Sequence, residues 1–321
     1  MIVRRADVQA GIISLLLVAV VASSFLRLVH GSQATDERGA VAGARHVSLA
    51  SPFTPTQATP PPIRLSDREP GANARSMYVV DVESGYPLYA FNADQSVPIA
   101  STTKLMTAVI ATERYQLSEV ATVSRQAALT NGSGIGLVVD EQISVDALMK
   151  ALLIQSGNDA AMTLAEHMGL DTFVQRMNEK AAELGMTATT YKDPAGLNDE
   201  GRSSARDLGI IAAYALRNEV IQGVVRITNA TVQSDDLKYS HELETSNRLI
   251  KSDNPLYLPE VTGLKTGFTP DAGHCLVASA THNGHQIVSV VLGTNDQSAD
   301  ASARESRKLL TLAFDTFQWS E

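Results

Sequence analysis

The sequence of 321 residues contains only one cysteine, Cys275. A single cysteine excludes an intramolecular disulfide, a cluster of thiolate zinc ligands and a CxxC redox motif. Positive charge is also scarce, because 26 lysines and arginines face 35 acidic residues and leave a formal net charge of −9. This balance argues against nucleic acid as a general partner. Gly and Pro follow no collagen-like period, and 44% hydrophobic residues exclude a wholly disordered chain. The length allows one large domain and a small appendage.

The N-terminus has the form of an export signal. Arg4 and Arg5 precede an uncharged, largely apolar run at residues 8–26. A basic start and a short apolar stretch are typical of a secretory signal, and this run is also just long enough to cross a bilayer once. The positive charge keeps the N-terminus cytoplasmic. We therefore expect residues 1–30 to be a signal peptide or an N-terminal anchor in the inner membrane, the anchor being slightly favoured, and the remaining chain to lie in the periplasm.

Residues 31–74 have the composition of a flexible linker. They are rich in Gly, Ala, Ser, Thr and Pro, include the run Pro60-Pro61-Pro62, and show no hydrophobic periodicity. Prolines favour extended segments that do not pack into a core. The sequence therefore predicts a tether at residues 31–74 and a folded domain at residues 75–321.

The folded domain begins and ends with strands and has helices between them. Periodicity and turn residues predict strands at 76–82, 87–91, 263–266, 275–280 and 286–293. They predict helices at 101–115, 171–184, 205–217 and 304–319, and a helical stretch at 144–168 that is interrupted at 156–158. Asn283-Gly284 is a strong signal for a tight hairpin between the last two strands. This order of elements indicates an α+β fold with a mainly antiparallel sheet.

A serine and a lysine lie three residues apart at the start of the first predicted helix. Ser101 and Lys104 form an S-x-x-K motif, and side chains at this spacing share one face of a helix. A serine hydroxyl needs a base to become a nucleophile, and an amine can serve if burial and nearby positive charge lower its pKa. Free N–H groups at the helix N-terminus can hold an oxyanion. Taken alone, however, the motif is equally compatible with a serine helix cap and a solvated lysine.

Two further motifs follow in a fixed order. Ser156-Gly157-Asn158 interrupts the helical stretch, and Lys265-Thr266-Gly267 lies on a predicted strand. With Ser101 and Lys104 they match the signature of the penicillin-recognising serine enzymes, S-x-x-K, S-D-N and K-T-G. Over residues 75–320 the chain resembles the low-molecular-mass penicillin-binding proteins, the serine D-alanyl-D-alanine peptidases of the peptidase S11 type. The resemblance implies their fold, an antiparallel sheet flanked by helices with a mostly helical subdomain.

The resemblance also implies a mechanism of acyl transfer. Ser101 would attack the carbonyl of a D-alanyl peptide bond in a peptidoglycan stem peptide, with Lys104 as the base. The hydroxyl of Ser156 would relay the proton to the leaving amine, and Asn158 would hold the amide of the peptide. Water would then release the acyl group. β-Lactam antibiotics would enter the same way, leave slowly and so act as inhibitors, and no metal or organic cofactor is needed.

The third motif would bind substrate. By the same resemblance, the backbone N–H groups of Ser101 and Phe268 would form the oxyanion hole. Lys265 and Thr266 would bind a carboxylate or carbonyl of the substrate. Gly267 has no side chain, so a substrate strand could lie against this edge.

Three other patterns are weaker than they look. Ser252-Asp253-Asn254 spells S-D-N more literally than residues 156–158, but it stands directly before Pro255 and is typical of a turn. His282 and His285 flank the Asn-Gly turn and have no third ligand, so we expect no metal site there. His274 and Cys275 are strand neighbours that face opposite sides, so they cannot pair and the thiol is expected to be buried.

Two other functions remain as alternatives. A β-lactamase of this fold needs a carboxylate base for deacylation, and the class A form resembles E-x-x-L-N, which is absent between Asn158 and Lys265 in the sequence. The position three residues before Leu197 is Pro194. A non-catalytic, penicillin-sensing or wall-binding module is disfavoured because the nucleophile, base and relay residues are all intact.

The bond that is cut is a separate question. Residues 265–269 and 272–277 look like the short endopeptidases that cleave D-alanyl–diaminopimelate cross-links, whereas residues 155–160 and 204–207 look like the carboxypeptidases. Many of the carboxypeptidases carry an extra β-domain and a C-terminal amphipathic anchor, and this sequence ends at Glu321 without them. We therefore expect D-alanyl-D-alanine endopeptidase activity in preference to carboxypeptidase activity.

Overall fold

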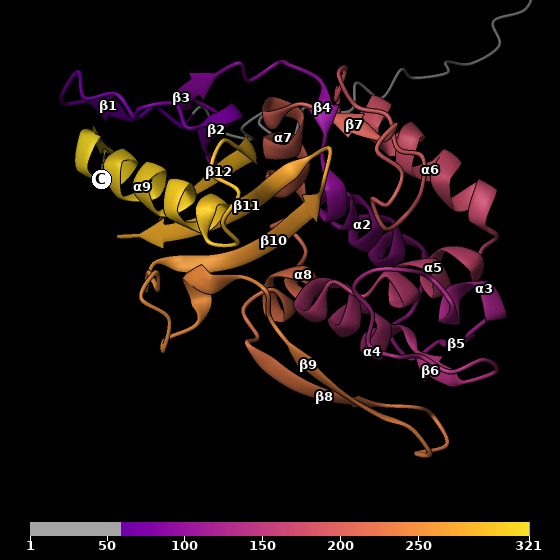
Figure 1. Cartoon of the computed structure of the whole chain (residues 1–321). Helices are drawn as coiled ribbons and strands as arrows, with labels where there is room; N and C mark the ends of the chain where they lie inside the picture. The colour runs from indigo at the N-terminus through magenta and orange to yellow at the C-terminus, as the bar shows by residue number, and fades with distance from the viewer. Residues whose placement is uncertain (1–58, 321) are drawn as a thin grey trace, which may run out of the picture. The chain divides into compact units, whose positions relative to one another are not determined.

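Five antiparallel strands form the central sheet, in the order β10-β11-β12-β2-β3 (Figure 1). The structure is a computed structural model and describes residues 59–320. The strands are β2 (Ala74–Asp81), β3 (Pro87–Phe91), β10 (Val261–Thr269), β11 (Gly273–His282) and β12 (His285–Thr294). Asn283 and Gly284 have φ angles of 51° and 85°, as a tight Asn-Gly hairpin requires, and this expectation is confirmed.

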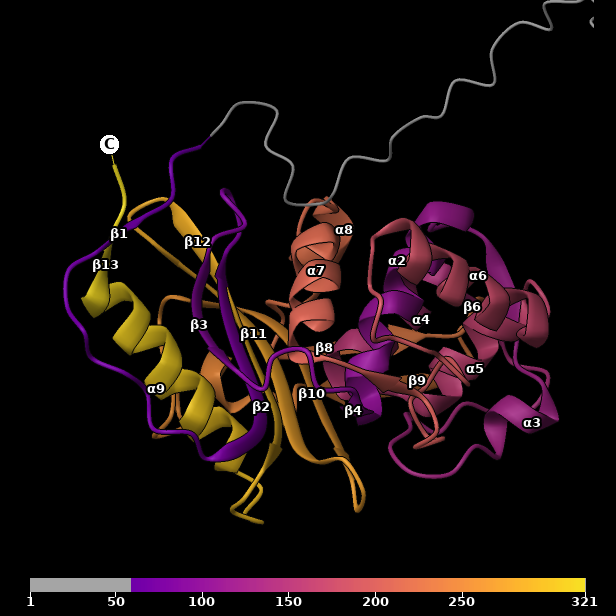
Figure 2. The same cartoon turned by 90° about the horizontal axis from the view of Figure 1, so that it is seen from above.

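The sheet is covered on both faces, which explains why β2 carries a continuous apolar run at residues 77–80. Tyr78 and Val80 of β2 join a hydrophobic cluster that includes helix α7 (Ala205–Ala215). Their neighbours Met77 and Val79 face the other side and pack with helix α9 (Ala301–Thr316). The view from above shows the sheet between these two helices (Figure 2). Since successive strand residues point to opposite faces, both sets must be apolar.

A mostly helical part is built around helix α2 (Lys104–Arg114), which follows a 3₁₀ turn, η1 (Ala100–Thr103). The elements that contact α2 are α4 (Val145–Lys150), the π-helical turn η2 (Ala151–Gln155), α5 (Asn158–Glu166), α6 (Leu170–Glu183), α7 and α8 (Glu219–Val224). Short helices α3 (Arg125–Ala128) and η3 (Arg248–Ile250) complete the described helical elements. The α+β class and the helical subdomain expected from the sequence are confirmed.

Small strand pairs connect these parts. They are β4 (Val97–Pro98) with β7 (Arg202–Ser203), β5 (Val120–Thr122) with β6 (Gln142–Ser144), and β8 (Asn229–Gln233) with β9 (Ser240–Glu244). None of them was among the strands expected from the sequence. Each is short, and the longer pair β8–β9 is largely polar, so hydrophobic periodicity gives little signal there.

The predicted start of the folded domain at residue 75 is wrong. Strand β1 (Ile63–Arg64) lies in the expected linker and pairs with β13 (Phe317–Gln318) at the other end of the chain. The N–H of Leu65 donates to the carbonyl oxygen of Thr316 at 2.7 Å. The guanidinium group of Arg64 lies 5.8 Å from the rings of both Tyr89 and Phe317. A strand of two residues is too short to show hydrophobic periodicity, and the prolines directly before it have the composition of a linker.

The expected signal or anchor at residues 1–30 and most of the expected linker lie outside the described residues. Within residues 59–320, no helix is both long enough and apolar enough to span a bilayer. Export and anchoring therefore stay predictions from the sequence.

The β1 segment should contribute to stability. A chain of residues 75–321 should have a free energy of unfolding about 2 kcal/mol lower than a chain of residues 59–321, because it loses the backbone hydrogen bonds of β1 and the contacts of Arg64. Urea denaturation of the two chains, followed by circular dichroism, measures the difference. Equal stabilities would mean that residues 59–74 do not belong to the folded domain.

Candidate active site

Ser101 lies on the 3₁₀ turn η1, directly after a strained residue. Ala100 has a φ angle of 48°, in the left-handed region that non-glycine residues rarely adopt. Residues three apart eclipse each other in a 3₁₀ turn. The side chains of Ser101 and Lys104 therefore lie on the same side of the turn, and Oγ of Ser101 is 2.9 Å from Nζ of Lys104. The predicted helix begins here, but its first turn is 3₁₀ and α2 starts only at Lys104.

The amine of Lys104 is completely buried and has three hydrogen-bond partners. They are the hydroxyl of Ser101 at 2.9 Å, Oδ1 of Asn158 at 2.7 Å and the carbonyl oxygen of Ala195 at 2.6 Å. Burial, and then the positive charge of Lys265, hold the pKa of Lys104 well below its usual range. A neutral amine has two N–H donors and one lone pair. Because Asn158 Oδ1 and the Ala195 carbonyl can only accept, the lone pair is left for the hydroxyl of Ser101, as a general base requires.

Ser156 and Asn158 lie at the predicted interruption of the helical stretch. The π-helical turn η2 ends at Ser156, whose φ angle is 65°, and α5 begins at Asn158. Nδ2 of Asn158 donates to the carbonyl oxygen of Asn131 at 2.7 Å, while its Oδ1 accepts from Lys104. The side chain is only 2% exposed, and its amide joins Lys104 to the segment of Asn131. Only one of the two N–H donors of Nδ2 is used in these contacts, so a contact of Asn158 with the amide of the peptide stays a prediction.

Strand β10 brings the third motif to the nucleophile. A Cβ atom on Gly267 would lie 3.1 Å from the backbone N of Ser101 and 3.1 Å from the carbonyl oxygen of Ile99. The absence of a side chain at Gly267 therefore allows a close approach of β10 to η1. That a substrate strand lies against this edge stays a prediction. Phe268 follows it with 53% of its surface exposed, and its ring lies 4.4 Å from that of His274.

The polar side chains of this strand differ in their surroundings. Lys265 is buried, its Nζ donates to the carbonyl oxygen of Thr266 at 3.0 Å, and burial lowers its pKa to about 7. The hydroxyl of Thr266 is 2.5 Å from that of Ser246, in the chain between β9 and β10. Lys265 is near enough to Lys104 for its positive charge to lower the pKa of that amine.

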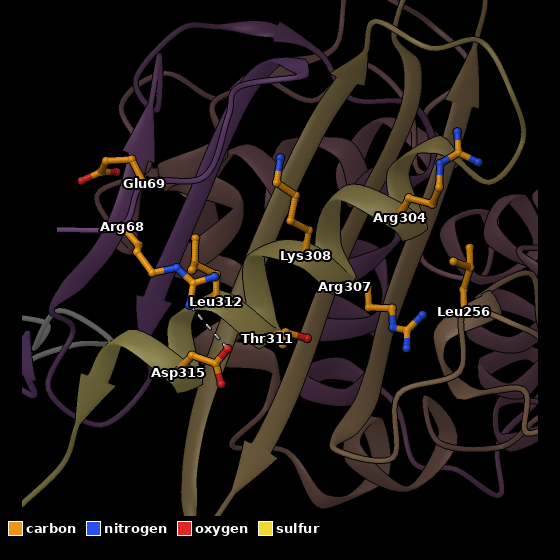
Figure 3. A pocket seen from close by; sticks show the side chains of 9 residues that line it. All are labelled: Arg68, Glu69, Leu256, Arg304, Arg307, Lys308, Thr311, Leu312 and Asp315. Atoms are coloured by element: carbon orange, nitrogen blue, oxygen red, sulfur yellow. Dashed lines mark ion pairs between the residues drawn. The ribbon is translucent and has the colours of Figure 1, made fainter. Parts of the chain in front are cut away.

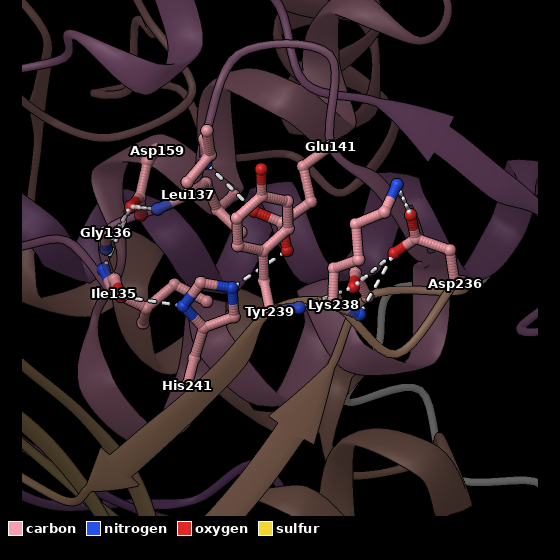
Figure 4. A network of polar contacts seen from close by, with 11 residues as sticks. Ile135, Gly136, Leu137, Glu141, Asp159, Asp236, Lys238, Tyr239 and His241 are labelled. Atoms are coloured by element: carbon pink, nitrogen blue, oxygen red, sulfur yellow. Dashed lines mark hydrogen bonds and ion pairs between the residues drawn. The ribbon is translucent and has the colours of Figure 1, made fainter.

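Sequence reasoning missed two carboxylates that build the site. Oδ2 of Asp159 accepts three backbone N–H groups, from Ile135, Gly136 and Leu137, at 2.9–3.2 Å (Figure 4). The same segment carries Ser133, whose carbonyl oxygen accepts from the N–H of Asn158 at 2.7 Å. The second carboxylate, Asp193, organises the turn that offers the carbonyl of Ala195 to Lys104. Its neighbours Pro194 and Gly196 do predict a turn, but not its contact with Lys104.

A buried histidine supports the Asp159 segment from the other side. His241 of β9 has Nε2 2.8 Å from Oε1 of Glu141 and Nδ1 3.0 Å from the carbonyl oxygen of Ile135 (Figure 4). The other carboxylate oxygen of Glu141 accepts from the N–H of Val138 at 2.9 Å. The hairpin β8–β9 and helix α5 therefore hold residues 133–138 between them.

Comparison with known proteins assigns the chain to a family. The family described as D-alanyl-D-alanine carboxypeptidase, peptidase S11, matches residues 64–296. The chain belongs to this family. The S-x-x-K, S-G-N and K-T-G residues described above all lie within the matched segment.

Individual relatives carry both carboxypeptidase and endopeptidase names. The D-alanyl-D-alanine carboxypeptidase DacF of Bacillus subtilis is 34% identical over 254 residues, which cover 76% of this chain and 63% of the relative. The D-alanyl-D-alanine endopeptidase of Pseudomonas aeruginosa is 34% identical over 243 residues, covering 74% and 77%. The crystal structure of the Streptomyces K15 DD-transpeptidase is similar with a TM-score of 0.71 and 28% identity, over 77% of this chain and 99% of that one. The chain thus spans just under two thirds of the Bacillus subtilis carboxypeptidase.

The weaker patterns behave as turns or core. Oδ1 of Asn254 accepts from the N–H of Leu256 at 2.9 Å, so the second S-D-N sequence is a turn, as expected. His282 and His285 are cross-strand neighbours at the end of the β11–β12 hairpin, and His285 stacks on Trp319. Cys275 is buried, and burial raises the pKa of its thiol to about 11. The expectation of a buried thiol is confirmed.

A hollow of about 690 Å³ lies away from the site, on the outer face of α9 (Figure 3). Arg68, Arg304, Arg307 and Lys308 give it a basic lining. Most of these cations have carboxylate partners, which are Asp315 for Arg68, Asp296 for Arg304 and Glu305 for Lys308. α9 packs on the face of the sheet opposite to η1 and α2, so this hollow does not belong to the active site.

Two glycines test how tightly the nucleophile is packed. Gly196 and Gly185 have similar φ angles of 76° and 73°, but a Cβ on Gly196 would lie 2.0 Å from the carbonyl oxygen of Ala100, whereas one on Gly185 meets nothing within 4 Å. Gly185→Ala should cost about 1–2 kcal/mol for the left-handed backbone alone. Gly196→Ala should cost about 3 kcal/mol or more, since the clash adds to the same strain. Urea denaturation of both variants measures this, and equal losses would contradict the packing described here.

Proposed function

We propose that the protein hydrolyses D-alanyl peptide bonds of peptidoglycan stem peptides through an acyl-enzyme on Ser101. One observation carries the proposal. The buried amine of Lys104 donates to two groups that can only accept, Asn158 Oδ1 and the Ala195 carbonyl. Its lone pair is therefore left to accept the proton of the Ser101 hydroxyl. A solvated lysine three residues after a helix cap would show neither the burial nor these partners. Membership of the peptidase S11 family supports the same chemistry.

In the acylation step, the amine of Lys104 removes the proton from Ser101 as its oxygen attacks the carbonyl carbon. The bond from Ser101 Oγ to carbon forms, the peptide C–N bond breaks, and the proton passes to the leaving amine with Ser156 as the relay. Ser156 lies at the turn that also supplies Asn158, so the relay and the support of the base come from one segment. A water molecule then attacks the acyl carbon, the bond from this carbon to Ser101 Oγ breaks, and the proton of the water passes to Ser101 as the acid product leaves.

The developing negative charge would be held by the backbone. The N–H groups of Ser101 and Phe268 are proposed as the oxyanion hole, because β10 passes so close to η1 that a Cβ on Gly267 would lie 3.1 Å from the backbone N of Ser101. Lys265 and Thr266 would bind a carboxylate or carbonyl of the substrate. The burial that lowers the pKa of Lys265 to about 7 implies that this positive charge is lost as the pH rises above neutrality.

A β-lactam would acylate Ser101 in the same way and leave slowly, so we propose penicillin binding as a second property of the site. Peptidoglycan lies outside the cytoplasm, which agrees with the export signal expected at residues 1–30. Anchoring by residues 8–26 in the inner membrane is part of the same proposal.

Labelling with a fluorescent penicillin tests the nucleophile. Ser101→Ala should abolish covalent labelling because the attacking oxygen is lost, and it should leave the circular dichroism spectrum unchanged because Lys104 keeps its bonds to Asn158 and Ala195. Ser252→Ala is the matched control, since Ser252 begins the S-D-N sequence that lies in a turn, and it should be labelled like the unaltered chain. Labelling that survives in Ser101→Ala would refute the assignment.

Within this chemistry we favour the endopeptidase reaction. The endopeptidase of Pseudomonas aeruginosa is as identical to the chain as the Bacillus subtilis carboxypeptidase is, and a larger share of its length is covered. The exposed side chains of Phe268 and Leu197, 53% and 44% accessible, offer apolar surface beside the nucleophile for a bulky branched leaving group. A carboxypeptidase needs to hold only a terminal D-alanine.

The products decide between the two reactions. The protein should convert purified cross-linked muropeptide dimers to monomers faster than it releases D-alanine from monomeric pentapeptide, as measured by liquid chromatography. Ser101→Ala should do neither. Release of D-alanine with the dimers left intact would make the protein a carboxypeptidase.

A further inference from the structure

Four backbone N–H groups converge on the carboxylate of Asp193. Its Oδ1 accepts from Ala195 at 2.7 Å, Gly196 at 2.6 Å and Leu197 at 3.2 Å. Its Oδ2 accepts from Asn198 at 2.8 Å. The carboxylate therefore fixes the direction of the four peptide groups between Pro194 and Asn198. One of these planar groups joins Ala195 to Gly196, and it carries both the N–H of Gly196 and the carbonyl oxygen that accepts from Lys104.

The turn is also fixed from outside. The hydroxyl of Thr107 in α2 donates to the carbonyl oxygen of Pro194 at 2.6 Å. Gly196 is packed so closely against the peptide of Ala100 that a Cβ would collide with it. On the side of β10, the hydroxyl of Thr269 donates to Oδ1 of Asp199 at 2.7 Å. A small change inside the turn must therefore move the carbonyl of Ala195 rather than the turn as a whole.

We propose that Asp193 is a positioning residue for the base, because it aims the carbonyl of Ala195 at the amine of Lys104 and places a negative charge near the same amine. This inference rests on the proposed function, in which Lys104 removes the proton of Ser101. Asp193 does not touch the reacting atoms. It acts through the Ala195 carbonyl and through its charge.

The negative charge of Asp193 opposes the effects that lower the pKa of Lys104. Burial and the charge of Lys265 in β10 lower the pKa of Lys104, whereas the charges of Asp193 and of Asp159 in α5 raise it. Removing the charge of Asp193 should therefore lower the pKa of Lys104 further. A larger fraction of the amine is then neutral in acid, so the acidic limb of the acylation profile should move to lower pH. Lys265 should not move with it, because burial alone sets its shift.

Two substitutions separate geometry from charge. In Asp193→Asn the charge is lost, the side-chain oxygen can still accept from Ala195, Gly196 and Leu197, and only the bond from Asn198 is lost, since the NH2 group cannot accept. In Asp193→Ala the charge and all four hydrogen bonds are lost. Glu200→Gln is the matched control, because it removes the charge of an exposed carboxylate in the same loop, beyond the turn.

The experiment measures the rate constant for acylation by fluorescent penicillin as a function of pH, using the full chain. Asp193→Asn should shift the acidic limb to lower pH and keep the maximal rate within about threefold, since the hydrogen bond from Gly196 that orients the Ala195 carbonyl is retained. Asp193→Ala should lower the maximal rate by about tenfold to a hundredfold, because a misdirected base loses its alignment. Glu200→Gln should follow the unaltered chain.

The outcomes distinguish the two proposals. An acidic limb that stays in place in Asp193→Asn overturns the inference, whatever Asp193→Ala does, because a merely structural side chain would lower the rate equally at every pH. If Asp193→Ala does not fold, the Asn variant alone decides. An unaltered chain that is not labelled at Ser101 refutes the proposed function instead.

Discussion

The structure depends on keeping an amine buried and uncharged beside a hydroxyl. Among residues 59–320, no carboxylate forms a hydrogen bond or ion pair with Nζ of Lys104, and its two acceptors are the neutral oxygens of Asn158 and Ala195. A buried ammonium group without a counter-charge is costly, so burial favours the neutral form, which is the base that the nucleophile needs. The segments around the site can be understood from this requirement: α5 supplies one oxygen, the turn of Asp193 supplies the other, and β10 brings a second cation.

Two residues with strained backbone lie at the same place. Ala100 and Ser156 both have left-handed φ angles although neither is glycine, and they stand beside the proposed nucleophile and at the proposed relay. Such conformations persist only where the surroundings impose them. The surroundings here are rigid, because η1 is held between the Gly196 turn and Gly267 of β10. The two-sided sheet behind β10 gives this strand a fixed position, so the packing of the fold maintains the strain that the site requires.

The sequence allowed the local features to be predicted and left out the distant ones. The pairing of Ser101 with Lys104 follows from a spacing of three residues, and the break at Ser156 follows from the glycine beside it. The partners of Asn158 could not be predicted in this way, because its Oδ1 accepts from Lys104 and its Nδ2 donates to Asn131, which lie in other segments of the chain. The same is true of β1, which exists only because the far end of the chain passes beside it.

The two buried lysines of the site have different proposed roles, Lys104 as the base and Lys265 as the cation that binds substrate. Lys265 acts on Lys104 by its charge, whereas Lys265 itself is shifted by burial alone, to a pKa of about 7. When Lys265 is protonated, Lys104 is pushed further toward the neutral form, so one cation for the substrate and one base for Ser101 exist together. As the pH rises through 7, Lys265 loses its positive charge, and with it the contribution that this charge makes to lowering the pKa of Lys104. We therefore expect the acidic limit of activity to be set by protonation of Lys104 and the alkaline limit by the loss of the proton of Lys265 in β10.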